Sequence, residues 1–189
     1  MARYVTASIS GISPLIQSRK HNDPKLNKSE TADAYEARTW RSKAHIVDGC
    51  IAIPSMAFKQ ALEAMGKHLG MQIPGKGKST YTKHLRSGVS FESLMCVTST
   101  PGSQVAEQHI YCNSDGVRGS GKRVDRIFPL ITGWKADVKF LLFDDALTDS
   151  VFEEHLNQAG ILIGVGAFRV ENGGLCGRFK VDSFKWGNT

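Results

Sequence analysis

The chain has 189 residues, 41% of them hydrophobic and 22% charged, and a formal net charge of +6 at pH 7. These values exclude a disordered or fibrous protein and fit a single globular domain over residues 1–189, with a core of its own. The excess of positive charge permits an anionic partner.

No apolar run reaches the length of a membrane span, and the N-terminus lacks the apolar stretch of a signal peptide. The four cysteines have neither metal-ligand nor CxxC spacing. We therefore expect a cytoplasmic protein with no membrane partner, no metal site and no cofactor.

The N-terminal part contains two predicted strands on either side of a polar segment. Arg3–Ile12 and Ile51–Ile53 have the β-branched, apolar patterns of strands. The residues between them, about 17–43, are poor in apolar side chains and predict a mobile insertion with a short helix over Thr31–Arg41.

An amphipathic helix is predicted from Ser55, its N-cap, to about Leu69, because apolar residues recur there at helical spacing. A basic segment follows this helix. No acidic residue lies between Glu63 and Glu92, whereas this interval contains Lys67, Lys76, Lys78, Lys83 and Arg86.

The C-terminal part predicts strands over 89–98, 108–112, 127–131, 136–143 and 178–186, and a helix from its N-cap Thr148 to Ala159. The order of elements predicts an α+β fold of ferredoxin-like or RNA-recognition type. In this fold an antiparallel sheet is backed by two helices, and we expect an inserted, thumb-like hairpin within about 75–126.

Two phosphate-binding signatures are excluded. Gly70–Lys76 fits most of a Walker loop, but Gly77 stands where serine or threonine is required. Gly164 and Gly166 begin a dinucleotide motif in which Arg169 replaces the third glycine, and the loop follows a helix instead of a strand.

Three basic, glycine-rich loops, at 75–86, 118–126 and 164–180, favour nucleic-acid binding. Glycine lets a backbone approach a polyanion closely, arginine and lysine neutralise phosphate, and an aromatic ring can stack on an unpaired base. The alternative interpretation of each loop is a solvated connection. The predicted nucleic-acid-binding residues are Lys76, Lys78, Tyr81, Lys83, Arg86, Arg118, Lys122, Arg123, Arg169 and Arg178.

Three segments carry a resemblance to a known family: GISPL at 11–15, IPSMAFKQAL at 53–62 and IGVGAFRVENGGLCGRF at 163–179. The chain resembles the RAMP superfamily, the ferredoxin-like proteins of CRISPR effector complexes. More narrowly, it is similar to stand-alone phage and prophage relatives of the backbone subunit.

The resemblance implies a glycine loop before the last strand, here Gly164–Gly177, and a thumb-like hairpin within Lys76–Gly121. It also implies that Arg19–Lys43 contacts nucleic acid or a neighbouring subunit, and that subunits assemble head-to-tail along a single strand.

The first function predicted is non-catalytic, sequence-independent binding of single-stranded nucleic acid, RNA or DNA, by a self-assembling protein in phage replication, recombination or a CRISPR-related role. One alternative is a metal-independent RNA-processing endonuclease with His84 as general base beside Lys83 or Lys78. Another is a phage-encoded mimic that binds a host CRISPR complex.

Overall fold

A seven-stranded sheet forms most of the larger lobe in the computed structural model, which describes residues 2–114, 119 and 121–188. Its strands follow the order β10-β1-β9-β6-β4-β3, with β5 paired to β9 outside this path, and the pairings are antiparallel. The strands are β1 Arg3–Gly11, β3 Ile46–Val47, β4 Cys50–Pro54, β5 Val89–Phe91, β6 Met95–Pro101, β9 Lys135–Leu142 and β10 Phe179–Asn188.

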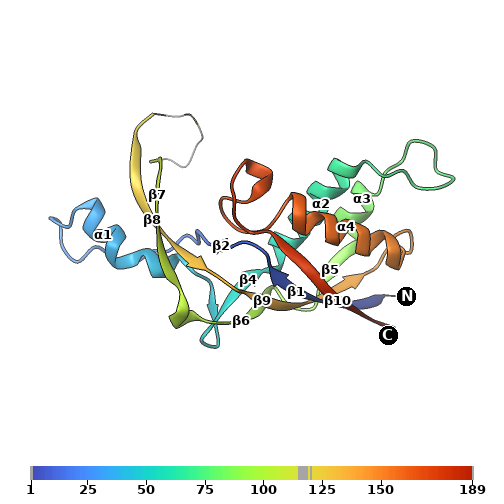
Figure 1. Cartoon of the computed structure of the whole chain (residues 1–189), viewed down its shortest axis with the longest axis horizontal. Coiled ribbons are helices and arrows are strands. Elements are labelled where there is room, and N and C mark those ends of the chain that lie inside the picture. The colour runs from blue at the N-terminus through green and yellow to red at the C-terminus, as the bar shows by residue number, and fades with distance from the viewer. Residues whose placement is uncertain (1, 115–118, 120, 189) are drawn as a thin grey trace.

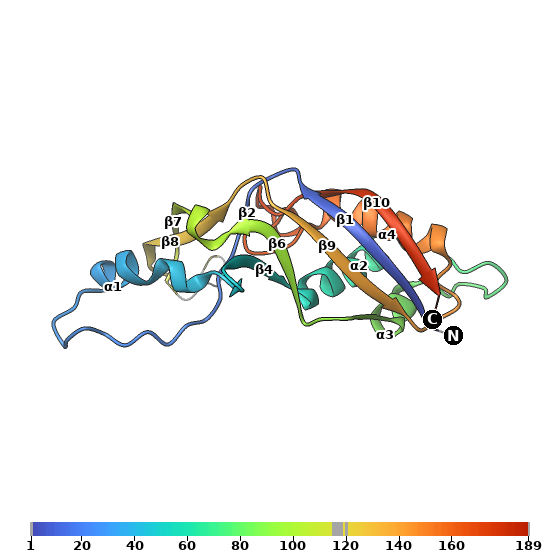
Figure 2. The same cartoon turned by 90° about the horizontal axis from the view of Figure 1, so that it is seen from below.

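Helices α2 (Ser55–Leu69), α3 (Thr82–Gly88) and α4 (Asp149–Leu162) lie together in the larger lobe, and α4 lies behind the sheet in Figure 2. Ring contacts join helix and sheet: Phe58 meets Phe179 with centroids 5.7 Å apart, and Phe152 meets Phe140 at 5.1 Å. The predicted helices α2 and α4 are confirmed, because the apolar side chains that define their periodicity are the ones buried against the sheet.

Three details of the sequence-based prediction are wrong. Ser55 is the first helical residue instead of the N-cap, and its hydroxyl donates to the carbonyl of Ser93 at 2.6 Å. The predicted strand 89–98 is two strands, β5 and β6, both of which pair with β9. The basic segment after α2 contains the helix α3, which the periodicity analysis missed because it is only 7 residues long.

A smaller second lobe, here called the hairpin lobe, projects from the sheet at the left of Figure 1. It combines the polar segment 17–43 with the expected hairpin, although this hairpin extends beyond 126. Its elements are β2 Leu15–Ile16, α1 Ala32–Thr39, the 3₁₀ turn η1 Trp40–Lys43, β7 Ala106–Asn113 and β8 Arg123–Ile131, with β8 paired to both β2 and β7. Two further 3₁₀ turns are η2 Gly102–Gln104 and η3 Val170–Asn172.

A buried ion pair attaches the polar segment to the hairpin. Lys43 and Glu36 are 7% and 8% exposed and contact each other directly. The Lys43 ammonium also donates to the carbonyl of Ile127 at 2.7 Å, and the Glu36 carboxylate accepts from the amide of Ile127 at 2.9 Å. The two side chains thus bind both backbone polar groups of Ile127, as a neighbouring strand would.

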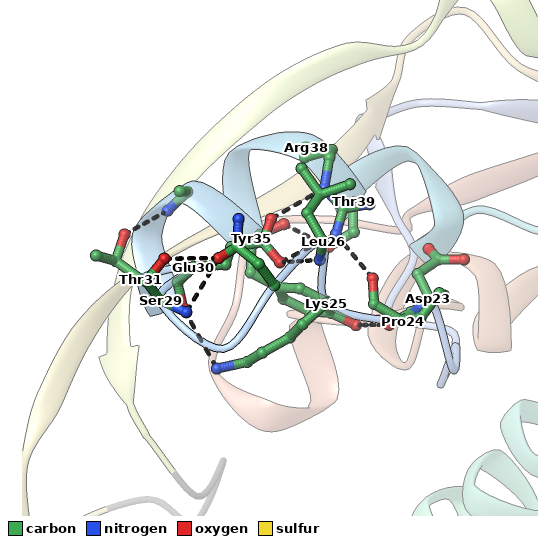
Figure 3. A network of polar contacts seen from close by, with 12 residues as sticks. Asp23, Pro24, Lys25, Leu26, Ser29, Glu30, Thr31, Tyr35, Arg38 and Thr39 are labelled. Carbon is green, nitrogen blue, oxygen red and sulfur yellow. Dashed lines mark hydrogen bonds and ion pairs between the residues drawn. The ribbon is translucent and has the colours of Figure 1, made fainter.

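The outer end of the polar segment is organised around Arg38 (Figure 3). Its guanidinium donates to both carboxylate oxygens of Glu30, at 3.0 and 3.2 Å, and to the carbonyl of Pro24 at 2.9 Å. It also lies over the Tyr35 ring, whose hydroxyl donates to the carbonyl of Asp23. A segment nearly without apolar residues is therefore folded back on α1 by polar contacts, while its mobility stays a prediction.

Candidate nucleic-acid interface

The glycine loop between α4 and β10 is folded tightly on itself. A Cβ atom at Gly177 would lie 1.9 Å from the carbonyl oxygen of Val165, and one at Gly174 would lie 1.8 Å from that of Phe168. Backbone hydrogen bonds join the two arms, Val165 to Gly177 at 3.0 Å and Cys176 to Phe168 at 3.1 Å. These two glycines therefore serve the packing of the loop itself, and an approach of the loop backbone to a polyanion stays a prediction.

The two arginines of this loop have different positions. Arg178 donates from Nε to the carbonyl of Ile161 at 3.0 Å, in the last turn of α4, where a cation complements the helix dipole. Arg169 pairs with Glu171 at 2.9 Å and lines a cavity. Both arginines are partly exposed, and Arg169 is the one that lines this cavity.

This cavity, here called the Arg19 groove, lies where the glycine loop, the first turns of α2 and the chain after β2 meet. Its volume is about 400 Å³. The residues that line it include Leu15, Arg19, His45, Ile53, Met56, Gln60, Phe168 and Arg169. They come from four separate parts of the chain, so no local sequence motif predicts the groove.

Backbone and side-chain hydrogen bonds fix the wall that carries Arg19. The Gln17 side chain is buried and joins two segments, because its amide donates to the carbonyl of Ala52 at 2.8 Å and its oxygen accepts from the amide of His45 at 2.7 Å. The amide of Arg19 donates to the carbonyl of Lys43 at 2.9 Å. The buried Lys43–Glu36 pair therefore also helps to position Arg19.

The ionisable side chains that line the groove are Arg19, His45 and Arg169, and Arg169 is paired with Glu171. Burial, and then the nearby charge of Arg19, lower the pKa of His45, so its ring is neutral at pH 7 and offers one donor and one acceptor. Arg19 also lines a second hollow of about 580 Å³, together with Lys20, Arg41 and Asp23. The two hollows thus share Arg19 and form what we call the basic track, in which four cations outnumber the carboxylates of Asp23 and Glu171.

The hairpin presents an exposed aromatic ring beside a predicted arginine. The Arg123 guanidinium lies 5.0 Å from the centre of the Tyr111 ring and donates to the carbonyl of Tyr111 at 2.6 Å. Tyr111 is 60% exposed. Lys122, the neighbour of Arg123, is exposed at the end of the same hairpin, and Arg118 lies outside the described residues.

The predicted site in 75–86 lies at the other end of the molecule, near α3 at the right of Figure 1. Tyr81 is only 5% exposed, and its ring packs edge-on against His84 and His155. The prediction that Tyr81 offers a stacking face is therefore wrong. The structure does not bring Lys76, Lys78, Lys83 and Arg86 together with the Arg19 groove, and their role in binding stays a prediction.

Acidic side chains from distant parts of the chain accompany this basic segment. Arg86 pairs with Glu63 at 2.6 Å, and Nδ1 of His84 lies 2.6 Å from Asp144. Lys76 lines a hollow with Asp144 and Asp145. The absence of acidic residues along the sequence therefore does not make this surface free of negative charge, and a ribonuclease role for His84 stays a prediction.

The pKa of the Glu63 carboxylate allows a direct test of its pairing with Arg86. Hydrogen bonds from Arg86 and then Lys67 lower the pKa of Glu63 from an ordinary value of 4.5 to about 2. The stabilisation that it provides is present above the unfolded pKa and is lost as the pH falls toward about 2. We expect a carboxyl titration followed by NMR to show Arg86→Ala raising this pKa more than Lys67→Ala does; an unchanged pKa in Arg86→Ala would contradict the pairing.

Comparison with solved structures identifies the fold. Cmr6 from Pyrococcus furiosus superimposes with a TM-score of 0.50 and 12% identity, over 96% of this chain and 99% of that chain. Neither protein-family models nor curated proteins match the sequence. The chain is thus an α+β protein with antiparallel sheets and a RAMP-like fold that has a ferredoxin-like core.

Two further structures show weaker similarity. A chain of the Type III-B Cmr-beta complex bound to cognate target RNA gives a TM-score of 0.49 and 11% identity, over 98% of this chain and 60% of that chain. A chain of a CRISPR RNA-guided surveillance complex gives 0.37 and 13%, over 96% and 67%.

Neither a metal site nor a membrane-spanning helix occurs among residues 2–114, 119 and 121–188. No three histidine, cysteine or acidic side chains there gather as a metal site requires. Within the same residues, no helix is long and apolar enough to cross a membrane.

Sequence reasoning missed several residues of the groove. His45, Met56 and Gln60 belong to no charged cluster, and they reach the groove only through the packing of α2 and β3 beside the glycine loop. Arg19 had one signal, since the family resemblance implied that the tract beginning there contacts nucleic acid.

Proposed function

We propose that the chain binds single-stranded nucleic acid along the Arg19 groove, in a CRISPR-related role. The observation that carries this proposal is the basic track itself. Arg19 and Arg169 flank a cavity between the two lobes, and Lys20 and Arg41 continue the positive charge beside Arg19. Cations in a row neutralise the phosphates of a strand, and such contacts carry no sequence information.

The exposed Tyr111 ring, stacked with Arg123, supports the single-stranded form of the ligand. An aromatic face on the surface can stack on an unpaired base but not on one inside a duplex. Phosphate contacts and base stacking are common to RNA and DNA, so the proposed ligand is a single strand of either kind. Several copies assemble head-to-tail along one strand, and the hairpin lobe of each copy contacts the next copy.

The test is fluorescence anisotropy with labelled single-stranded RNA, single-stranded DNA and duplex at several salt concentrations and strand lengths. Four cations on the track predict that log affinity falls with log salt with a slope of about −3, at about 0.7 per phosphate. Affinity that rises with strand length would support assembly. Salt-insensitive binding, or binding no tighter to single strands than to duplex, would contradict the proposal, and a lack of all binding would favour a protein partner.

A further inference from the structure

The Arg19 groove has an apolar floor, which a site for phosphate alone does not need. Leu15 and Ile53 are 0% and 1% exposed and lie beneath the groove, and the apolar surface open to a ligand belongs to Met56, which is 58% exposed in the first turn of α2, and to the half-buried Phe168. A phosphate held against such a floor would lose water without gaining hydrogen bonds there. A flat, weakly polar group loses little hydration free energy against the same floor.

Polar side chains also line the groove, Gln60 and His45 among them. Gln60 follows Met56 by one turn of α2 and so faces the same side. The neutral His45 ring adds one donor and one acceptor. Ligand sites are usually cavities of 300–1,000 Å³ that combine apolar walls with placed polar groups, and this groove of about 400 Å³ has both.

The loop that closes the groove holds a bulky residue in an unusual conformation. Phe168 has φ of +54°, in the left-handed region that a large side chain rarely adopts. Its carbonyl accepts from Cys176 and its ring packs edge-on against Phe128, with centroids 5.2 Å apart. The surrounding structure thus keeps Phe168 at the groove, and strain of this kind concentrates at binding sites.

We propose that the groove holds one unpaired nucleobase, packed between Met56 and Phe168, with the phosphates on either side of it bound by Arg19 and Arg169. The base edge meets Gln60 and His45. A paired base cannot enter, because its edge is occupied and its faces are stacked. This inference rests on the proposed function and names the part of the strand that the groove recognises.

The test compares two single strands of equal length and charge, one with bases and one made entirely of abasic units, by anisotropy at one salt concentration. The strand with bases should bind at least about fivefold more tightly, since stacking of one base contributes roughly 1–3 kcal/mol. Equal affinities would overturn the base pocket and leave single-strand binding intact. A lack of binding by both strands would overturn the proposed function itself.

The variant Met56→Ala tests whether the base packs against Met56. Met56 is exposed, so the fold does not depend on its side chain. The variant should lose about fivefold in affinity for the strand with bases and nothing for the abasic strand. Phe143→Ala is the matched control, since Phe143 is 60% exposed and lines a different hollow, and it should change neither affinity.

A third measurement separates a base within a strand from a free nucleotide, which shares the same chemistry. Adenosine monophosphate is used as competitor for the labelled strand. It should displace the labelled strand only at concentrations far above those at which the unlabelled strand with bases displaces it. Displacement at equal concentration would assign the groove to a free nucleotide and overturn the strand-bound form of the proposal.

Discussion

Replacing Glu36 by alanine should destabilise the hairpin lobe by about 3–5 kcal/mol, the cost of leaving one partner of a buried ion pair without the other. The remaining Lys43 ammonium would be buried with the carbonyl of Ile127 as its hydrogen-bond partner, and the amide of Ile127 would lose its acceptor. Hydrogen exchange of the β7 and β8 amides, together with unfolding in denaturant, measures this loss.

Lys43→Met should destabilise the hairpin lobe somewhat less than Glu36→Ala does. Arg126 lies 3.8 Å from the Glu36 carboxylate and partly compensates its charge. The control is Glu92→Ala, which removes an ion pair with Lys139 whose side chains are 54% and 58% exposed. An exposed pair of this kind contributes less than about 1 kcal/mol. Equal effects of Glu36→Ala and Glu92→Ala would show that the buried pair does not hold the lobe.

Glu36→Ala should also weaken nucleic-acid binding, although Glu36 does not line the groove. The carbonyl of Lys43 accepts from the amide of Arg19. Loss of the Lys43–Glu36 pair therefore loosens the segment that positions Arg19. The stability of the lobe and the shape of the binding site are therefore linked through one residue.

Charge reversal at both Arg19 and Arg169 should reduce the affinity for single strands more than about a hundredfold. Each arginine gives charge-assisted hydrogen bonds worth about 1.5–3 kcal/mol, and a glutamate in its place repels phosphate. Alanine at either position should lower the salt slope by about 0.7, one phosphate for each cation. Anisotropy at several salt concentrations gives both quantities.

The control for the single variant Arg19→Glu is Lys78→Glu, which makes the same change of charge at the opposite end of the molecule. It should leave the affinity within a few-fold of wild type. A loss from Lys78→Glu as large as that from Arg19→Glu would instead confirm the site that the sequence predicted in 75–86 and contradict the groove.

Local patterns in the sequence determined the main helices and their order. Phe58, Leu62 and Met65 recur at helical spacing and are buried in α2, and Thr148 caps α4 as expected, accepting from the amide of Val151. The position of the glycine loop between α4 and the last strand was also predictable. Periodicity and capping act within a few residues, so a single sequence contains that information.

Only the tertiary structure decided which of these residues are available to a ligand. Tyr81 is buried under α4, Arg86 meets Glu63 across 23 positions, and Gly174 and Gly177 pack against their own loop. The groove, by contrast, joins Arg19, His45, Met56 and Arg169. Burial and pairing of charge depend on contacts between distant segments, and these contacts follow from the packing of the whole chain and not from the composition of any one loop.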